Sequence, residues 1–318
     1  MSTFATLPES VRVERLKAPP PGCRTVIDTD TNNEIDDQFA LVHALLSPEI
    51  RIEAVYAAPF KNAHAATAEA GMEQSFEEIL NVYDHLGLPE LPPVFRGSRR
   101  NLTGYGTPEK SPATEHLIGT AFASDEPLYV LGIGAITNVA NALLLEPKLV
   151  EKMVVVWLGG HAHHWAHTWE FNLEQDVLGS ALLLDSGVPV VHLPCQGVVS
   201  KLHTTVPEME RYVRGRGKIG DYLFDLFADH VEQDKLPTYA RSKELWDSAV
   251  VAWTLNPDWF ETDLRPTPCV METKEPRRIA WSFDARRHLL RYVYNLHRDP
   301  ILRDFFDKLA GHAAREMA

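Results

Sequence analysis

Short apolar runs alternate with longer amphipathic segments over the first two thirds of the chain. The runs are rich in β-branched residues and predict strands at residues 24–29, 51–57, 128–133, 153–158 and 189–193. The amphipathic segments predict helices at residues 36–46, 63–86, 135–144 and 176–184. Most of the predicted strands are continuously apolar, which is typical of parallel strands covered on both faces. The pattern therefore predicts an α/β fold with an open, mostly parallel sheet flanked by helices.

The last third of the chain shows a different pattern. From residue 206 onward we expect mostly helix, with a late strand at residues 278–283 and either a strand or a helix at residues 291–296. No repeat or low-complexity linker divides the sequence. We therefore expect one domain over residues 1–318, with its core at residues 24–255 and a mostly helical part at residues 206–318.

Net charge and composition limit the classes of binding partner and the cellular compartment that we expect. The 318 residues carry a net charge of −13, which argues against binding to nucleic-acid backbones or anionic membranes. No apolar stretch is long enough to span a membrane, and the first 22 residues lack the apolar core of a signal peptide. The three cysteines, Cys23, Cys195 and Cys269, show no metal-finger spacing. We expect a cytoplasmic protein with no nucleic-acid or membrane partner.

Acidic residues gather directly after the first predicted strand. Asp28, Asp30, Glu34, Asp36 and Asp37 lie in one short segment, at the strand end where open α/β sheets bind ligands. Carboxylates this close repel one another unless a cation lies among them. An all-oxygen set of ligands selects Ca²⁺ or Mg²⁺. A solvated acidic loop is the alternative interpretation.

Two other carboxylate motifs are possible interpretations of this segment. An EF-hand loop beginning at Asp28 would need glycine and glutamate where Asn33 and Phe39 stand, so this motif is excluded. The DTD sequence at residues 28–30 resembles the DxD of haloacid-dehalogenase-type phosphatases, but Asn32 stands where that family has threonine or valine. A Mg²⁺-dependent phosphohydrolase therefore remains an alternative function.

The acidic segment also resembles the DxDPGxDD signature of the inosine–uridine-type nucleoside hydrolases. The second aspartate of the signature falls on Asp30 and its final pair on Asp36 and Asp37, with a turn that is two residues longer here. Three further motifs follow in the family's order. They are GAITNVA at residues 134–140, LGG at 158–160 followed by EFN at 170–172, and Trp-Asp at 246–247 where the family has His-Asp. The resemblance covers roughly residues 24–255.

This resemblance implies the Rossmann-like fold of the family and hydrolysis of the N-glycosidic bond of ribonucleosides, or of a related N-riboside, by a Ca²⁺-bound water. By resemblance, Asp30, Asp37, Asp247 and the carbonyl of Ile133 ligate the Ca²⁺ ion, and Asp30 is also the general base. Asp36 orients the water and the sugar. The resemblance further implies a homodimer or a homotetramer.

Five residues are expected to contact the substrate. By resemblance, Glu170 and Asn172 hold ribose hydroxyl groups, and Asn62 follows the second strand where the family has another ribose contact. His164 stands where the family has an asparagine contact. Trp246 replaces the histidine that serves many members as the acid for the leaving base, and its indole is suited to stacking on that base.

The replacement by Trp246 leaves protonation of the leaving base open. Either solvent or another group protonates the base, or a histidine of the segment HAHHWAH at residues 161–167 does so. A zinc site in this segment was also considered, although HEXXH is absent. Because the usual acid is missing, a catalytically inactive ribose- or nucleoside-binding protein on the same fold is a further alternative.

Overall fold

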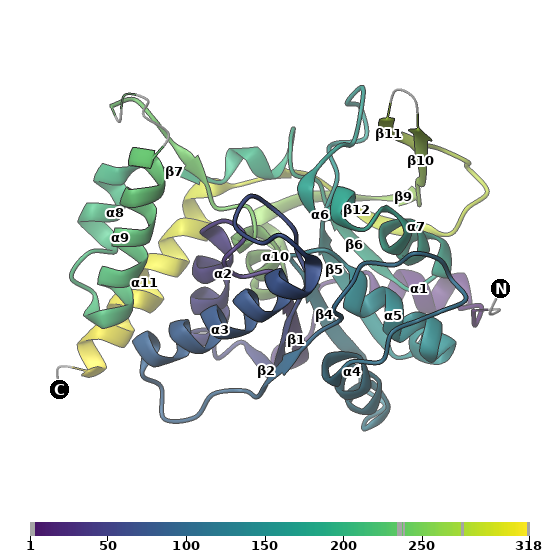
Figure 1. Cartoon of the computed structure of the whole chain (residues 1–318), viewed down its shortest axis with the longest axis horizontal. Coiled ribbons are helices and arrows are strands. Elements are labelled where there is room, and N and C mark those ends of the chain that lie inside the picture. The colour runs from purple at the N-terminus through teal and green to yellow at the C-terminus, as the bar shows by residue number, and fades with distance from the viewer. Residues whose placement is uncertain (1–3, 234–236, 238, 275–276, 317–318) are drawn as a thin grey trace.

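The computed structural model describes residues 4–233, 237, 239–274 and 277–316. An eight-stranded sheet with the order β3-β2-β1-β4-β5-β6-β12-β9 runs through the centre of the molecule (Figure 1). Its strands are β1 (Cys23–Thr29), β2 (Ile50–Ala57), β3 (Val94–Arg96), β4 (Leu128–Gly132), β5 (Met153–Leu158), β6 (Val190–Leu193), β9 (Phe260–Pro266) and β12 (Leu289–Leu296). All neighbours in this sheet are parallel except β12 and β9. The predicted α/β fold with an open, mostly parallel sheet is confirmed.

Helices cover both faces of the sheet and bury its apolar strands. One face carries α2 (Asp36–Leu45), α3 (Ala68–Leu86), α9 (Gly217–Gln233), α10 (Ser248–Leu255) and α11 (Arg298–Glu316). The other face carries α4 (Pro112–Phe122), α5 (Thr137–Leu145) and α7 (Val177–Ser186). On β1, Ile27 packs into the first core and Val26 into the second. A strand buried on both faces needs apolar residues at successive positions, which is why these strands are continuous apolar runs.

Shorter elements complete the chain: α1 (Glu9–Arg15), α6 (Phe171–Gln175), α8 (Val206–Tyr212), β7 (His203–Thr204) and β8 (Lys243–Glu244). The strands β10 (Cys269–Lys274) and β11 (Arg277–Ser282) form a separate antiparallel pair. The helix expected from residue 63 begins instead at Ala68, because residues 63–67 belong to a loop beside the pocket described below.

The expectation of a mostly helical segment after residue 206 was incomplete. Four strands occupy much of residues 260–296, and residues 291–296, which fitted either structure, belong to strand β12. This strand is held between β6 and β9 in the main sheet. Pairing with distant strands decides its conformation, and no local pattern shows that pairing.

The order of the strands creates a crevice at one edge of the sheet. From β1 the chain moves outward to β2 and β3, then returns to β4 on the other side of β1 and continues to β5 and β6. The carboxyl ends of β1 and β4 therefore flank a topological switch point, where open α/β sheets bind ligands. Asp30 follows β1 and Ile133 follows β4 at this point.

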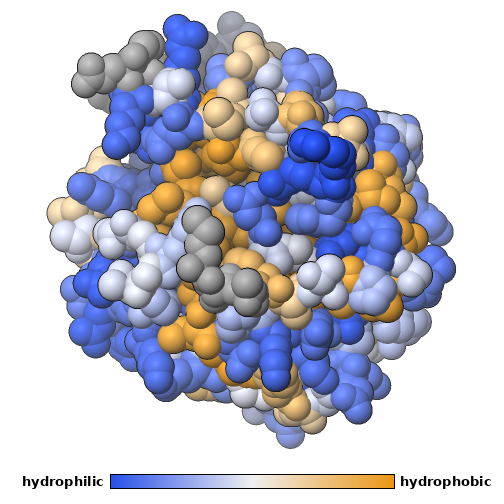
Figure 2. Space-filling model, turned by 90° about the vertical axis from the view of Figure 1, so that its right-hand side faces the viewer, coloured by the Kyte–Doolittle hydropathy of each residue, from blue (hydrophilic) through white to orange (hydrophobic). Residues whose placement is uncertain are grey.

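Hydrophobic and hydrophilic residues lie side by side on the face that Figure 2 shows. Within the described part of the chain, no helix is long and apolar enough to cross a membrane. Cys23, Cys195 and Cys269 are free thiols, as expected from their spacing.

Helix α3 closely approaches the loop after β2 at Gly71. A Cβ atom at this position would lie 2.0 Å from the backbone oxygen of Phe60. We expect Gly71→Ala to lower the free energy of unfolding by about 1–3 kcal/mol, because the helix or the loop must move. Gly119→Ala, on the exposed side of α4, is the matched control, since its Cβ meets nothing within 4 Å. It should raise the free energy of unfolding by about 0.5–1 kcal/mol in urea titrations, and equal effects of the two substitutions would contradict the packing argument.

Candidate active site

A cavity of about 410 Å³ opens at the carboxyl ends of the central strands. All the site residues expected from the sequence line it, except His164. His161 of the histidine-rich segment also lines it, together with residues to which the sequence assigned no role in the site, among them Asn33 and Cys195. The topology thus brings together segments between residues 30 and 247.

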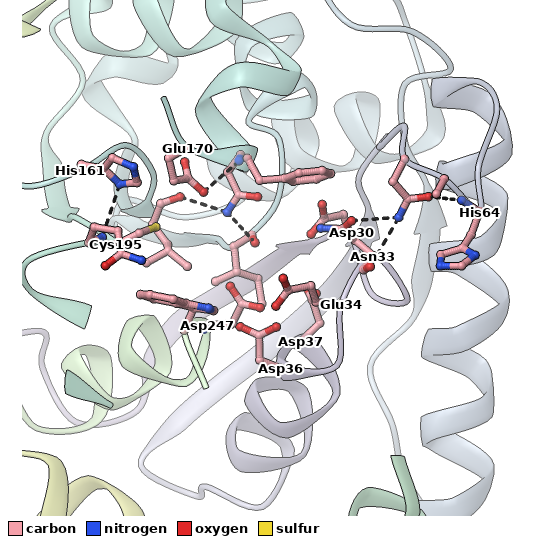
Figure 3. A pocket seen from close by; sticks show the side chains of 18 residues that line it. Asp30, Asn33, Glu34, Asp36, Asp37, His64, His161, Glu170, Cys195 and Asp247 are labelled. Atoms are coloured by element: carbon pink, nitrogen blue, oxygen red, sulfur yellow. Dashed lines mark hydrogen bonds between the residues drawn. The ribbon is translucent and has the colours of Figure 1, made fainter. Parts of the chain in front are cut away.

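Four aspartates meet in this pocket (Figure 3). Asp30 follows β1, Asp36 and Asp37 form the first turn of α2, and Asp247 directly precedes α10. Their exposed fractions are only 1% to 4%. One carboxylate oxygen from each of Asp36, Asp37 and Asp247 lies within 4.8 Å of the other two. Three of the carboxylates can therefore share one cation.

Few hydrogen bonds compensate these buried charges. The Thr29 hydroxyl donates to Oδ1 of Asp37, and the backbone N–H of Asp247 donates to Oδ2 of Asp36 at 3.3 Å. Oδ2 of Asp30 is buried and has no hydrogen-bond partner among the described residues. A buried, unpartnered carboxylate oxygen beside three other carboxylates is a strong indication of a cation site.

The electrostatics of the cluster agree with this interpretation. Burial raises the pKa of Asp36 to about 6, although the nearby charge of Lys243 acts to lower it. Burial, followed by the charges of neighbouring aspartates, raises the pKa values of Asp30, Asp37 and Asp247 well above the usual range. A divalent cation would offset both burial and repulsion, and these oxygen donors fit Ca²⁺ or Mg²⁺.

Ile133 lines the same pocket directly after β4. Its carbonyl oxygen accepts a hydrogen bond from Nδ2 of Asn172 at 3.1 Å, and this amide also donates to the carbonyl of Leu158 at 3.3 Å. A carbonyl oxygen has two lone pairs, so the Ile133 carbonyl can accept a second contact. Asn172 thus joins the ends of β4 and β5.

Glu170 has a structural function that the sequence did not reveal. Its carboxylate caps α6 by accepting the backbone N–H groups of Asn172 at 2.9 Å and Leu173 at 3.0 Å. It also accepts the N–H of Gly160 at 2.7 Å. Burial raises the pKa of Glu170, while these backbone donors and the Cys195 thiol act to lower it. Glu170 therefore holds the turn after β5 against α6, and this fixes the position of Asn172.

Asn62 is similarly engaged within its own loop. Its Oδ1 accepts the backbone N–H groups of His64 at 2.8 Å and Ala65 at 2.9 Å. Its Nδ2 donates to Oδ1 of Asn33 in the acidic turn at 3.1 Å (Figure 3). Asn62 lines the pocket and also ties its loop to the turn that carries the aspartates.

The expectation for His164 is corrected by the structure. His164 is exposed and lines a separate pocket together with Arg265 and Phe283. The neighbouring His163 stacks on Tyr292 with 4.0 Å between ring centroids, which draws this part of the segment away from the aspartates.

His161 is the histidine of this segment that lines the aspartate pocket. It is 8% exposed, and its Nδ1 accepts the backbone N–H of Gln196 at 3.4 Å. Burial is the main cause that lowers the pKa of His161. Sequence spacing alone does not show which of several clustered histidines faces a pocket.

Trp246 and Asp28 occupy different surroundings. The half-buried indole of Trp246 packs against the hydrophobic core and lines the pocket next to Asp247. Asp28 does not line the pocket, and its Oδ1 accepts Nδ2 of Asn138 at 2.7 Å. Burial raises the pKa of Asp28 to about 7. A phosphohydrolase that uses Asp28 together with Asp30 is therefore not favoured by this geometry.

The rule that ligands bind at strand ends could have identified two of the additional pocket residues. Cys195 and Gln196 follow β6 at the same edge of the sheet as the aspartates. The Cys195 thiol is almost fully buried beside Glu170, and burial raises its pKa well above the usual range. It is therefore a neutral thiol that completes the wall of the pocket.

Fold and site together define an α/β protein with a cluster of buried carboxylates, able to hold a cation, at the switch point of its sheet. The sequence profile described as "Inosine-uridine preferring nucleoside hydrolase" matches residues 25–298, and the chain belongs to this family. The protein is accordingly a hydrolase that acts on N-glycosyl compounds. The family resemblance seen in the sequence is confirmed.

Individual relatives agree with this assignment. The pyrimidine-specific ribonucleoside hydrolase RihA of Salmonella paratyphi A is 28% identical over 268 residues, covering 74% of this chain and 81% of that protein. The structure is similar to a purine-preferring ribonucleoside hydrolase from Gardnerella vaginalis, with a TM-score of 0.73, 21% identity, and coverage of 93% and 100% of the two chains. A plant nucleoside hydrolase, PpNRh1, gives a TM-score of 0.71 at 16% identity, with 91% and 99% coverage. These structures share the fold.

Binding of a divalent cation to the aspartates should release protons. The pKa of Asp36 is about 6, and burial and neighbouring charges raise the pKa values of Asp30, Asp37 and Asp247 well above the usual range, so a Ca²⁺ ion must displace protons from the cluster in mildly acidic solution. We expect the affinity for Ca²⁺ to increase with pH, by about tenfold per pH unit below about pH 6 for the proton on Asp36. Calorimetry in two buffers of different ionisation enthalpy counts these protons, and an affinity independent of pH would contradict the prediction.

Proposed function

We propose that the protein hydrolyses the N-glycosidic bond of ribonucleosides, or of a related N-riboside, to give ribose and a free base, with Ca²⁺ bound by the aspartates. The observation that carries the proposal is the meeting of Asp36, Asp37 and Asp247 within 4.8 Å, in a pocket that Glu170 and Asn172 also line. The relatives are named for pyrimidine and for purine ribonucleosides, which supports a ribonucleoside substrate without selecting its base.

By the family resemblance, the cation would be held by Asp30, Asp37, Asp247 and the Ile133 carbonyl, with Asp36 of the three-carboxylate cluster beside it. A bound Ca²⁺ would supply Lewis acidity that makes a water ligand more acidic, and the oxygen positions not taken by the protein would suit the 2′ and 3′ hydroxyl groups of the sugar. Oδ2 of Asp30 has no partner among the described residues, so it is available to accept the proton of the attacking water. Asp36 orients the water and the sugar from the first turn of α2.

The sugar develops positive charge as the glycosidic bond breaks. The carboxylates around the pocket stabilise this charge, and the fixed scaffold requires little rearrangement during the reaction. Asn172 donates to the Ile133 carbonyl through Nδ2, so its Oδ1 remains to accept a ribose hydroxyl. Glu170 fixes this asparagine and forms the adjoining wall, while Asn62 contributes on the side of the acidic turn.

The leaving base would lie against Trp246. Its indole presents a broad apolar face suited to stacking on a planar base. His161 is the histidine of the 161–167 segment that reaches this pocket, and it replaces His164 in our assignment of a base contact. The alternative function, a nucleoside-binding protein without turnover, rests on the absence of the family's histidine at position 246.

We also infer the one-domain organisation, the cytoplasmic location and the homodimer or homotetramer that the sequence led us to expect. The free cysteines are in keeping with a reducing compartment. Two exposed apolar side chains, Met271 in β10 at 55% and Phe283 directly after β11 at 54%, support association between copies.

A panel of purine and pyrimidine nucleosides tests the reaction through release of reducing sugar. We expect turnover that requires Ca²⁺ and is lost on chelation. Asp30→Ala and Asp247→Asn should each lower kcat/KM by more than about a hundredfold, since each removes a cation ligand. Asp28→Asn is the control and should retain turnover. Near-native rates for Asp30→Ala would contradict the assignment of the site. Binding of ribose without turnover would favour the nucleoside-binding protein. Phosphatase activity that is lost on Asp28→Asn would favour a phosphohydrolase.

Substitution of Trp246 should affect recognition of the base. We expect Trp246→Ala to lower kcat/KM by about 10- to 100-fold, because stacking on a base contributes about 1–3 kcal/mol. Trp246→Phe should retain most of the activity. Steady-state kinetics on one purine and one pyrimidine nucleoside measure the effect, and an unchanged kcat/KM on every substrate would show that the indole does not stack on the base.

A further inference from the structure

The acidic turn at residues 31–34 is the main local departure from the family signature, and it is two residues longer. Asn32 adopts a left-handed conformation, with φ of 83°, and the N–H of Asn33 closes the turn on the carbonyl of Asp30 at 2.9 Å. Asn33 and Glu34 of this turn line the pocket (Figure 3). Each of these side chains binds a different neighbouring segment.

Glu34 binds Lys243, which lies 209 positions further along the chain. The ammonium of Lys243 lies 2.9 Å from Oε2 of Glu34 and donates at 2.9 Å to the carbonyl of Glu244. The Lys243 side chain is only 13% exposed and that of Glu34 46% exposed. Lys243 belongs to β8, just before Trp246 and Asp247. The ion pair therefore joins the turn that carries the first aspartates to the segment that carries the last one.

Two hydrogen bonds also tie the acidic segment to its neighbours. The N–H of Asp247 donates to Oδ2 of Asp36 at 3.3 Å, and Nδ2 of Asn62 donates to Oδ1 of Asn33 at 3.1 Å. The turn is thus tied on one side to the β8–α10 segment and on the other side to the loop after β2. Both partner segments line the pocket.

We propose that Glu34 and Lys243 are positioning residues whose ion pair sets the separation between Asp36, Asp37 and Asp247 and thereby the affinity of the cation centre. The proposal rests on the proposed function only in placing a cation among these aspartates. Buried carboxylates repel one another, so a fixed separation requires an attachment between the segments that carry them. Outer partners of metal ligands commonly change metal affinity by about 10- to 100-fold.

The direction in which two substitutions change the affinity for Ca²⁺ distinguishes positioning from a simple effect of charge. Through space alone, Lys243→Met removes a positive charge and would strengthen Ca²⁺ binding, whereas Glu34→Gln removes a negative charge and would weaken it. Positioning predicts that both substitutions weaken binding. It also predicts that the Kd of the double variant is no higher than the larger of the two single-variant Kd values. The two residues act as one pair, so losing the second adds nothing.

Calorimetric titration of the full-length protein with Ca²⁺ tests the proposal. We expect Glu34→Gln and Lys243→Met each to raise Kd by about tenfold, Lys243→Arg to retain most of the affinity, and the melting temperature to change little. Lys152→Met is the control, because it breaks the ion pair with Asp125 at 3.2 Å, in which Asp125 is fully exposed. It should leave Kd unchanged.

Opposite signs for Glu34→Gln and Lys243→Met, or no change in either, would overturn the proposal. If Lys243→Met fails to fold, the charge-conserving variant Glu34→Asp decides. Its shorter side chain breaks the ion pair without changing the charge, so positioning predicts a higher Kd, and a Kd equal to that of the native protein overturns the proposal. A native protein that binds no Ca²⁺ would overturn both this proposal and the cation centre. A native protein that binds Ca²⁺ but hydrolyses no N-riboside would overturn the proposed function alone, because the calorimetric comparison stands without turnover.

Discussion

Four carboxylates that repel one another are buried together at the carboxyl ends of the central strands. Asp30, Asp36, Asp37 and Asp247 are almost inaccessible to solvent. Burial raises all four pKa values, and the charges of neighbouring aspartates raise those of Asp30, Asp37 and Asp247 further. A fold gains nothing in stability from such a cluster unless a cation occupies it. The local features around the cluster, including the Thr29 hydroxyl and the ion pair of Lys243, hold the carboxylates in place for that cation.

Several polar residues that line the pocket also hold its scaffold together. Glu170 caps α6 and binds the turn after β5, Asn172 joins the ends of β4 and β5, and Asn62 joins its loop to the acidic turn. Because these contacts link separate strand ends, a change at one of them moves several pocket residues together. This arrangement fixes the geometry of the site before a substrate arrives, which reduces the rearrangement needed during the reaction.

The side of the pocket that would receive the base is lined by Trp246, at a position where the family resemblance implies a histidine. His161, Cys195 and Gln196 complete the adjoining wall. Burial keeps the Cys195 thiol neutral and lowers the pKa of His161. This wall is therefore better suited to bind a base by stacking and by hydrogen bonds from neutral groups than by a permanently charged side chain.

The parallel α/β sheet could be predicted from the sequence alone, because strands buried on both faces must be apolar at successive positions. The acidic strand end and the family could also be predicted, since these are contained in short contiguous motifs. Tertiary structure decided which polar groups meet. Glu34 and Lys243 are 209 residues apart, β12 is a strand through its pairing with β6 and β9, and His161 rather than His164 faces the aspartates. Periodicity shows which face of an element is buried, whereas a hydrogen-bond partner depends on which distant segment the chain folds against.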